Sequence, residues 1–158
     1  MAPRGLLTLA GRPPSLERRR AQPMSGNGNP FPKSGPLVLV VDGDSSALGN
    51  TQTLLERNGY AVKTATTGEE ALQFLSKTVP DVLLLEIKLP GISGFDVCQV
   101  VKRNVRLQKV KVAFLTLEGS PRAYRMGLDA GADVFMTKPI APEGLLRAVR
   151  LVSPPAPA

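Results

Sequence analysis

Short apolar runs alternate with longer amphipathic stretches between residues 37 and 152. Three runs are almost wholly apolar: Leu37–Val41, Val82–Leu85 and Val110–Leu115. Continuous runs of this kind predict strands that are buried on both faces of a sheet. Two more mixed runs, Ala61–Thr66 and Ala132–Thr137, predict two further strands.

The stretches between these runs carry apolar residues at the spacing of helices. Five helices are predicted, around residues 47–55, 70–76, 97–105, 122–129 and 145–152. The first is expected to stop at Asn58-Gly59, and Ser120-Pro121 is a typical start for the fourth. Strict alternation of five strands with five helices predicts a parallel sheet covered by helices on both faces.

The two ends of the chain differ in composition from this middle part. Residues 1–36 hold seven prolines, six basic residues and a single acid, Glu17. Such a segment buries too little apolar surface to offset its ordering entropy, which predicts a disordered leader. A translation start at Met24 and a targeting function are the alternative interpretations. Residues 153–158 are expected to form a disordered Pro/Ala tail, with no output domain.

The net charge of +7 mostly belongs to the leader. Its six basic residues and one acid give +5, so residues 37–158 carry only +2, and a nucleic-acid partner is not favoured. The chain has no histidine, which excludes His-based catalysis and a phosphohistidine carrier. Its one cysteine, Cys98, excludes an intrachain disulfide and fits a cytoplasmic protein. No apolar run is long enough to span a bilayer, and no membrane partner is expected.

Polar residues follow four of the predicted strands. The first strand leads into Asp42-Gly43-Asp44, the third into Glu86, the fourth into Thr116 and the fifth into Thr137-Lys138-Pro139. Ligands of open parallel sheets bind beyond the carboxyl ends of the strands. We therefore expect these side chains to form one site.

These residues, in this order, resemble the receiver domain of bacterial two-component response regulators. The resemblance covers roughly residues 37–152 and implies a flavodoxin-like (βα)5 fold of three α/β/α layers. The segments that carry it are Val38–Asp42, Pro80-Asp81, Leu89–Phe95, Thr116, Gly127–Asp133 and Thr137-Lys138-Pro139.

The resemblance implies a site that accepts a phosphoryl group from a partner's phosphohistidine. The acceptor position is residue 86, and Asp42, Asp44 and residue 86 would be the ligands of a Mg²⁺ ion. Lys138 would pair with the phosphoryl oxygens, and Thr116 and Phe135 would be the switch residues. Pro139 is a candidate for a cis peptide bond.

Three positions depart from the family pattern. The acceptor position is Glu86 instead of aspartate, the second acidic position is Gly43, and the residue after the switch threonine is Leu117. The longer Glu86 side chain is expected to reach Lys138 or Thr116 without phosphorylation, and Lys88 is a second candidate partner for it. Gly43 and Glu86 weaken the Mg²⁺ site, and Leu117 is expected to narrow access to it.

Three hypotheses follow from these departures. The first is a degenerate receiver that acts by protein–protein interaction without phosphorylation. The second is an ordinary phosphorylatable receiver in which Asp44 substitutes for Gly43. The third is a phosphatase of the haloacid-dehalogenase type, because Asp42-x-Asp44 resembles its nucleophile motif. That family needs further acids after the lysine, and only Glu143 is present.

A protein partner is expected under the first two hypotheses, either a histidine kinase or a downstream signalling protein. The resemblance places a basic face on the last two helices, which carry Arg122, Arg125, Arg147 and Arg150. This face would dock on an acidic partner surface, and self-association through the same face is a second option. Solvated helix faces are the alternative interpretation of these charges.

Overall fold

A computed structural model describes residues 35–155 of the chain. The predicted leader falls on residues 1–34, and the last three residues of the predicted tail are 156–158, so these two predictions lie outside the described residues. The tail does not begin as an unattached segment, because Ser153 Oγ lies 3.2 Å from the hydroxyl of Tyr60. None of the described helices is long and apolar enough to cross a lipid bilayer.

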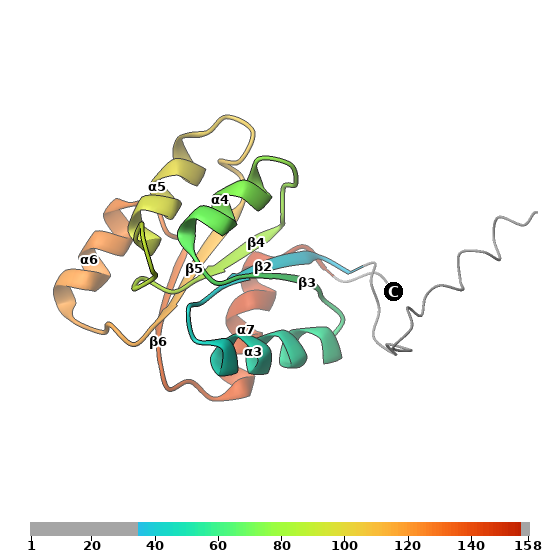
Figure 1. The fold of residues 1–158 in the computed structure, drawn as a ribbon. Coiled ribbons are helices and arrows are strands. Elements are labelled where there is room, and N and C mark those ends of the chain that lie inside the picture. The colour runs from blue at the N-terminus through green and yellow to red at the C-terminus, as the bar shows by residue number, and fades with distance from the viewer. Residues whose placement is uncertain (1–34, 156–158) are drawn as a thin grey trace, which may run out of the picture. The chain divides into compact units, whose positions relative to one another are not determined.

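Five parallel strands form one sheet in the order β3-β2-β4-β5-β6 (Figure 1). The strands are β2 (Leu37–Val41), β3 (Ala61–Ala65), β4 (Val82–Leu85), β5 (Lys111–Thr116) and β6 (Val134–Thr137). Strand β4 lies at the centre and is buried throughout, as its run of four apolar residues predicts. The predicted flavodoxin-like fold is confirmed.

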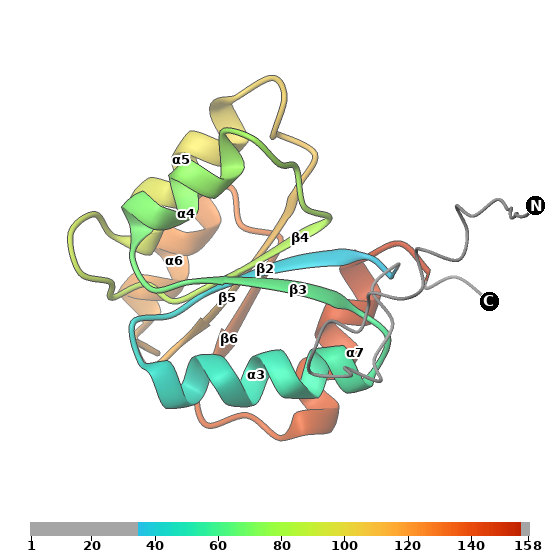
Figure 2. The same ribbon diagram turned by 45° about the vertical axis from the view of Figure 1, so that its right-hand side comes forward.

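Helices cover both faces of the sheet, as Figures 1 and 2 show. They are α3 (Ser45–Arg57), α4 (Gly68–Leu75), α5 (Gly94–Arg103), α6 (Pro121–Asp129) and α7 (Pro142–Val152). Helices α4, α5 and α6 enclose one apolar core with the sheet, and α3 and α7 enclose the second core on the other face. Two cores in a three-layer arrangement are the expected solution for a sheet that is apolar on both sides.

The predicted elements are present, with shifts of one or two residues at most ends. The third predicted helix was expected to reach Val105, which is wrong, because α5 ends at Arg103 and Val105 is 86% exposed. Asn104 takes an extended conformation there, and its side chain accepts a hydrogen bond from the backbone N–H of Arg106. The apolar residue that continues the core is Leu107, which is 3% exposed.

The carboxyl end of the central strand lies against the start of α5. A Cβ atom added at Gly94 would lie 2.2 Å from the carbonyl oxygen of Glu86, so only glycine permits this close approach. Ser93 and Asp96 form a capping box that fixes where α5 begins. The loop from β4 to α5 is thereby held at a defined position beside residue 86.

We predict that Gly94→Ala lowers the free energy of unfolding by about 2 kcal/mol, because the new methyl group overlaps backbone atoms that have no room to move. Urea unfolding followed by far-UV circular dichroism measures this change. Gly49→Ala is the matched control: Gly49 is exposed in α3, and a Cβ there meets nothing within 4 Å. It should stabilise the protein by about 0.5–1 kcal/mol. Equal effects of the two substitutions would contradict the steric explanation.

Candidate functional site

The carboxyl ends of β2, β4 and β5 place three polar side chains inside the protein. Asp42, Glu86 and Thr116 are 8%, 6% and 0% exposed, and they are the buried polar or charged residues within residues 35–155. Burying a carboxylate is costly unless a partner compensates its charge. The side chains near these three residues therefore decide what the site can do.

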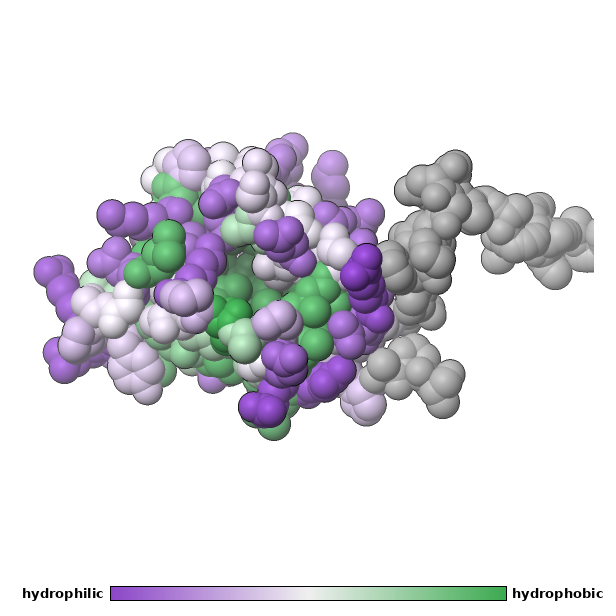
Figure 3. Space-filling model, turned by 90° about the horizontal axis from the view of Figure 1, so that it is seen from below, coloured by the Kyte–Doolittle hydropathy of each residue, from purple (hydrophilic) through white to green (hydrophobic). Residues whose placement is uncertain are grey.

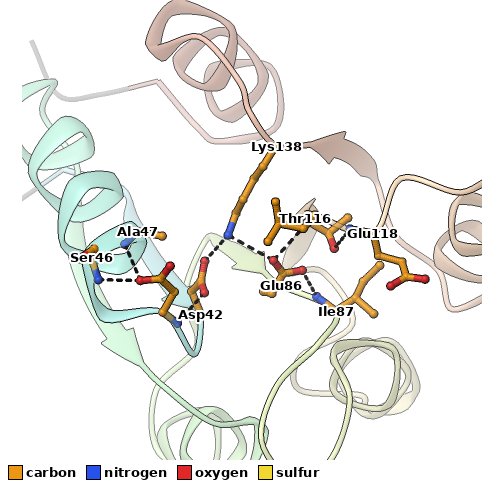
Figure 4. Close-up of polar contacts among 10 residues, drawn as sticks. Asp42, Ser46, Ala47, Glu86, Ile87, Thr116, Glu118 and Lys138 are labelled. Carbon is orange, nitrogen blue, oxygen red and sulfur yellow. Dashed lines mark hydrogen bonds and ion pairs between the residues drawn. The ribbon is translucent and has the colours of Figure 1, made fainter.

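Lys138, which follows β6, supplies the compensating charge. Its Nζ lies 2.6 Å from Oδ2 of Asp42 and 3.2 Å from Oε2 of Glu86. Figure 4 shows the ammonium group between the two carboxylates. Burial disfavours the charged form of Lys138, but hydrogen bonds and charge attraction from Asp42 and then Glu86 outweigh burial and raise its pKa above the usual 10.5. The predicted contact between Glu86 and Lys138 is present.

Glu86 also accepts hydrogen bonds from the backbone. Its Oε1 accepts the N–H of Ile87 at 2.7 Å, and its Oε2 accepts the N–H of Leu117 at 3.4 Å (Figure 4). The second bond joins the end of β4 to the loop after β5. Sequence reasoning did not identify either N–H as a partner, because backbone donors leave no mark in a residue pattern.

The two other expected partners of Glu86 are not bonded to it. Lys88, predicted as an alternative cation, is exposed and forms no ion pair with Glu86, because Lys138 takes that place. Oγ1 of Thr116 instead accepts a hydrogen bond from the backbone N–H of Glu118 at 2.9 Å, within the loop that follows β5.

Both oxygens of Asp42 are engaged, and Asp44 is directed at α3. Oδ1 of Asp42 accepts the backbone N–H of Asp44, and its Oδ2 faces Lys138. Oδ1 of Asp44 accepts the N–H groups of Ser46 and Ala47 and so caps α3. Within the described part of the chain, no three Asp, Glu, His or Cys side chains are grouped as a metal site would need.

The residues present therefore do not fit the Mg²⁺ ion that the resemblance implies. An ammonium group already lies between Asp42 and Glu86, and position 43 supplies no side chain. Hard cations such as Mg²⁺ take several oxygen ligands in a regular geometry. Here the two buried carboxylates point toward a lysine instead.

The predicted switch aromatic packs under α6. The ring centroid of Phe135 lies 5.9 Å from that of Phe114 and 5.4 Å from that of Tyr124. A Cβ at Gly127 would come within 2.8 Å of the Phe135 ring, so the ring and the helix are in close contact. Phe135 is therefore held inward, against the apolar core.

A cavity of about 540 Å³ opens at the carboxyl ends of β2, β4 and β5. Its walls include Asp42, Asp44, Glu86, Thr116 and Lys138, so the structure brings the predicted site residues together. Leu117 also lines the cavity, but it is 77% exposed and does not fill it. The peptide bond between Lys138 and Pro139 at the edge of the site is cis.

The four arginines predicted as a partner face are exposed on α6 and α7. Arg122 and Arg125 lie on α6, and Arg147 and Arg150 lie on α7. Arg150 lies 3.4 Å from the side-chain oxygen of Asn58, and none of the four forms an ion pair with another described residue.

Comparison with known proteins agrees with this geometry. Residues 38–150 match the family model of the response regulator receiver domain. The chain is 37% identical over 117 residues to the alkaline phosphatase synthesis transcriptional regulatory protein PhoP of Bacillus subtilis, covering 73% of this chain and 47% of PhoP. It is 34% identical over 115 residues to the DNA-binding dual master transcriptional regulator RpaA of Synechocystis, covering 73% of this chain and 48% of RpaA. The chain thus spans about half the length of these curated relatives.

Solved structures give the same result. A putative response regulator from Chloroflexus aurantiacus superposes with a TM-score of 0.71 at 33% identity, covering 74% of this chain and 96% of that one. The BeF3-activated DrrB receiver domain superposes with a TM-score of 0.68 at 32% identity, with the same coverage of both chains. On the strength of this match and of the shared order of site residues, the chain belongs to the response regulator receiver domain family.

Proposed function

We propose that this receiver domain signals by binding protein partners and does not depend on phosphorylation. The observation that carries the proposal is the pairing of Glu86 with Lys138 at 3.2 Å, together with the hydrogen bond from the Leu117 N–H. A cation and a loop N–H are the groups that a phosphoryl group at this position would use. In this chain the side chain at position 86 already uses them.

The length of the Glu86 side chain explains this arrangement. Glutamate has one methylene more than aspartate, so its oxygens extend further from the strand, toward the region where phosphoryl oxygens would lie. Its single negative charge is smaller than the charge that a phosphoryl group adds, which is about −1.5 to −2 at pH 7. Displacing a nucleophile by about 1 Å lowers its rate by roughly 10²-fold. Glu86 is therefore a poor phosphoryl acceptor and a weak permanent substitute for the phosphorylated state.

Lys138 completes the proposal because it serves as a built-in cation. Its ammonium group compensates the charges of Asp42 and Glu86 at the point where a metal ion would have to bind. Lys138 can therefore hold the two carboxylates next to each other without Mg²⁺. The domain is then expected to hold one conformation at physiological pH, whatever the supply of phosphoryl donor or metal.

The partner of such a domain is a protein, either a histidine kinase or a downstream signalling protein. The exposed arginines of α6 and α7 fit an acidic partner surface, and self-association through this face is the second option. The phosphatase interpretation receives less support, because the relatives named above are transcriptional regulators and Asp44, its general acid, caps α3.

We predict that the protein forms no phosphoryl adduct when it is incubated with acetyl phosphate and Mg²⁺. Intact-mass spectrometry, with hydroxylamine treatment to identify an acyl phosphate, checks this. The double variant Gly43→Asp/Glu86→Asp restores both acids of the family pattern and serves as the positive control. A stoichiometric adduct on Glu86 or Asp42 of the natural protein would contradict the proposal. The same samples should not hydrolyse p-nitrophenyl phosphate.

We also predict that Lys138→Met lowers the free energy of unfolding by about 2 kcal/mol at pH 7, because it leaves two buried carboxylates without their cation. The pKa of Lys138 is raised on folding, so its contribution is fully present below pH 10.5 and is lost as pH rises through the higher folded value. Urea unfolding of the natural protein and of Lys138→Met should be measured from pH 7 to roughly pH 11.5. The difference between their free energies of unfolding should shrink only at the alkaline end of this range.

Lys88→Met is the matched control for this experiment. Lys88 lines the same cavity but is exposed and forms no ion pair among the described residues, so its loss should change stability by less than about 0.5 kcal/mol. A Lys88→Met effect as large as that of Lys138→Met would show that charge in the cavity, and not the specific pairing, stabilises the site.

The basic partner face generates a further prediction. Reversing all four arginines, Arg122, Arg125, Arg147 and Arg150, to glutamate should abolish the recovery of specific partner proteins in affinity capture followed by mass spectrometry. Like charges would then face the acidic partner surface. The folded state should persist, since the four side chains are exposed. Recovery of the same partners with the variant would exclude this face as the docking surface.

A further inference from the structure

A cluster of positive charge lies at the end of the domain opposite the site. The segment from Lys102 to Lys111 holds five basic residues and no acidic one. It contains the last two residues of α5, the turn that follows and the first residue of β5. The small net charge of residues 37–158 conceals this local excess.

The turn is a fixed structure. Leu107 and Val110 are buried, and consecutive hydrogen bonds run from the N–H of Leu107 to the carbonyl of Asn104 and from the N–H of Val110 to the carbonyl of Leu107. Nζ of Lys102 donates to the carbonyl of Val110 at 2.8 Å and ties the turn to α5. The backbone that carries the exposed side chains of the turn is thus held in place before any partner binds.

The neighbouring loop between α4 and β4 adds to the same surface. The guanidinium of Arg106 donates to the carbonyl of Leu75, and the N–H of Lys111 donates to the carbonyl of Asp81. These bonds hold the two loops side by side, and Figures 1 and 2 both show them projecting at one end of the domain. We name this surface the basic tip, which consists of Lys77, Arg103, Arg106, Lys109 and Lys111.

None of the five residues of the basic tip forms an ion pair within residues 35–155, although Asp81 and Asp133 lie at the same end of the sheet. Lys102 pairs with Asp133 at 2.9 Å, and the other two ion pairs within residues 35–155 belong to Lys138. All five residues of the basic tip are exposed. Lys and Arg at the end of a helix are often explained by the helix dipole, but Lys109 and Lys111 lie beyond the last turn of α5.

Apolar side chains project among these charges. Val105 is 86% exposed within the turn, and Val79, in the neighbouring loop, is 47% exposed. No aromatic residue lies within residues 102–111 to stack on the bases of a single strand, and a phosphate backbone has no contact to offer a valine. An anionic lipid surface accommodates both features, because the cations attract its headgroups while the valine enters the interface.

We propose that the basic tip docks this domain on an anionic lipid bilayer. None of the described helices can span a bilayer, and docking on the bilayer surface needs no such helix. Four acids and two lysines line the cavity at the other end of the sheet, so that end carries an excess of formal negative charge and is disfavoured at an anionic surface. The docked domain then presents its site away from the bilayer, open to a protein partner.

The test is sedimentation of the full chain with vesicles of phosphatidylglycerol and phosphatidylcholine, at about 0.1 M salt so that charges still act over roughly 10 Å. The natural protein should bind these vesicles and should not bind vesicles of phosphatidylcholine alone. Each cation near an anionic membrane contributes about a five-fold factor. Lys109→Gln/Lys111→Gln should therefore weaken binding by about 25-fold.

Lys63→Gln/Lys88→Gln is the matched control, since it removes the same charge from exposed positions outside the basic tip, with Lys88 beside the cavity at the opposite edge, and should leave vesicle binding within about two-fold of the natural protein. Equal loss in the two variants would show that net charge alone drives binding and would overturn the proposal. So would unchanged binding of Lys109→Gln/Lys111→Gln, which would assign the binding to the basic residues before position 37.

Val105→Asn separates lipid from nucleic acid. It should weaken vesicle binding several-fold through the loss of apolar contact and leave the retention of a short DNA duplex unchanged. Failure of the natural protein to bind acidic vesicles, combined with duplex binding that Lys109→Gln/Lys111→Gln abolishes, would assign the basic tip to nucleic acid and overturn the proposal.

Discussion

Two carboxylates buried next to each other at the end of a parallel sheet require a positive charge, and in this chain a lysine provides it. Lys138 lies within 2.6 Å of Asp42 and 3.2 Å of Glu86, and it connects the loop after β6 to the ends of β2 and β4. Glu86 continues the connection to β5 through the N–H of Leu117. Four strand ends are thus joined by one set of charge-assisted contacts, which are stronger than neutral hydrogen bonds. The set fixes the ends of β2, β4 and β5 and the loop after β6 relative to one another.

Most of the architecture could be predicted from the sequence, because the apolar periodicity and the residues at helix ends favour the same elements that the fold contains. The apolar run Val82–Leu85 predicts a central strand, and β4 occupies the centre with all four residues buried. The errors occur where local geometry overrides periodicity. Val105 continues the apolar spacing of α5, yet the side chain of Asn104 stops the helix and the chain turns so that Leu107 reaches the core.

The site could be predicted only in part, and the missing contacts are of one kind. Side-chain chemistry at the strand ends indicated Asp42, Glu86, Thr116 and Lys138, and these do converge on one cavity. The contacts made by backbone N–H groups were not predictable, since any residue supplies the same donor. They decide much of the geometry: the N–H of Leu117 donates to Glu86, and the N–H of Glu118 donates to the hydroxyl oxygen of Thr116.

The distribution of charge links the site to the rest of the domain. Helices that follow parallel strands begin at the carboxyl edge of the sheet and end at the amino edge, and acids are favoured at helix starts and bases at helix ends. Glu69, Glu70 and Asp96 lie in first turns, whereas Lys102 and Arg103 lie in a last turn. The preference does not extend to every helix, because α3 and α6 have no acid in their first turns and Arg122 lies at the start of α6. The basic excess at the amino edge therefore comes mainly from α5 and the turn that follows it. The edge centred on Glu86 and the edge that carries residues 102–111 thus differ in chemistry, and the two proposals assign a different partner to each. Since position 86 and residues 102–111 lie at opposite edges of the sheet, a substitution at position 86 alters the cavity without removing any charge from the basic turn.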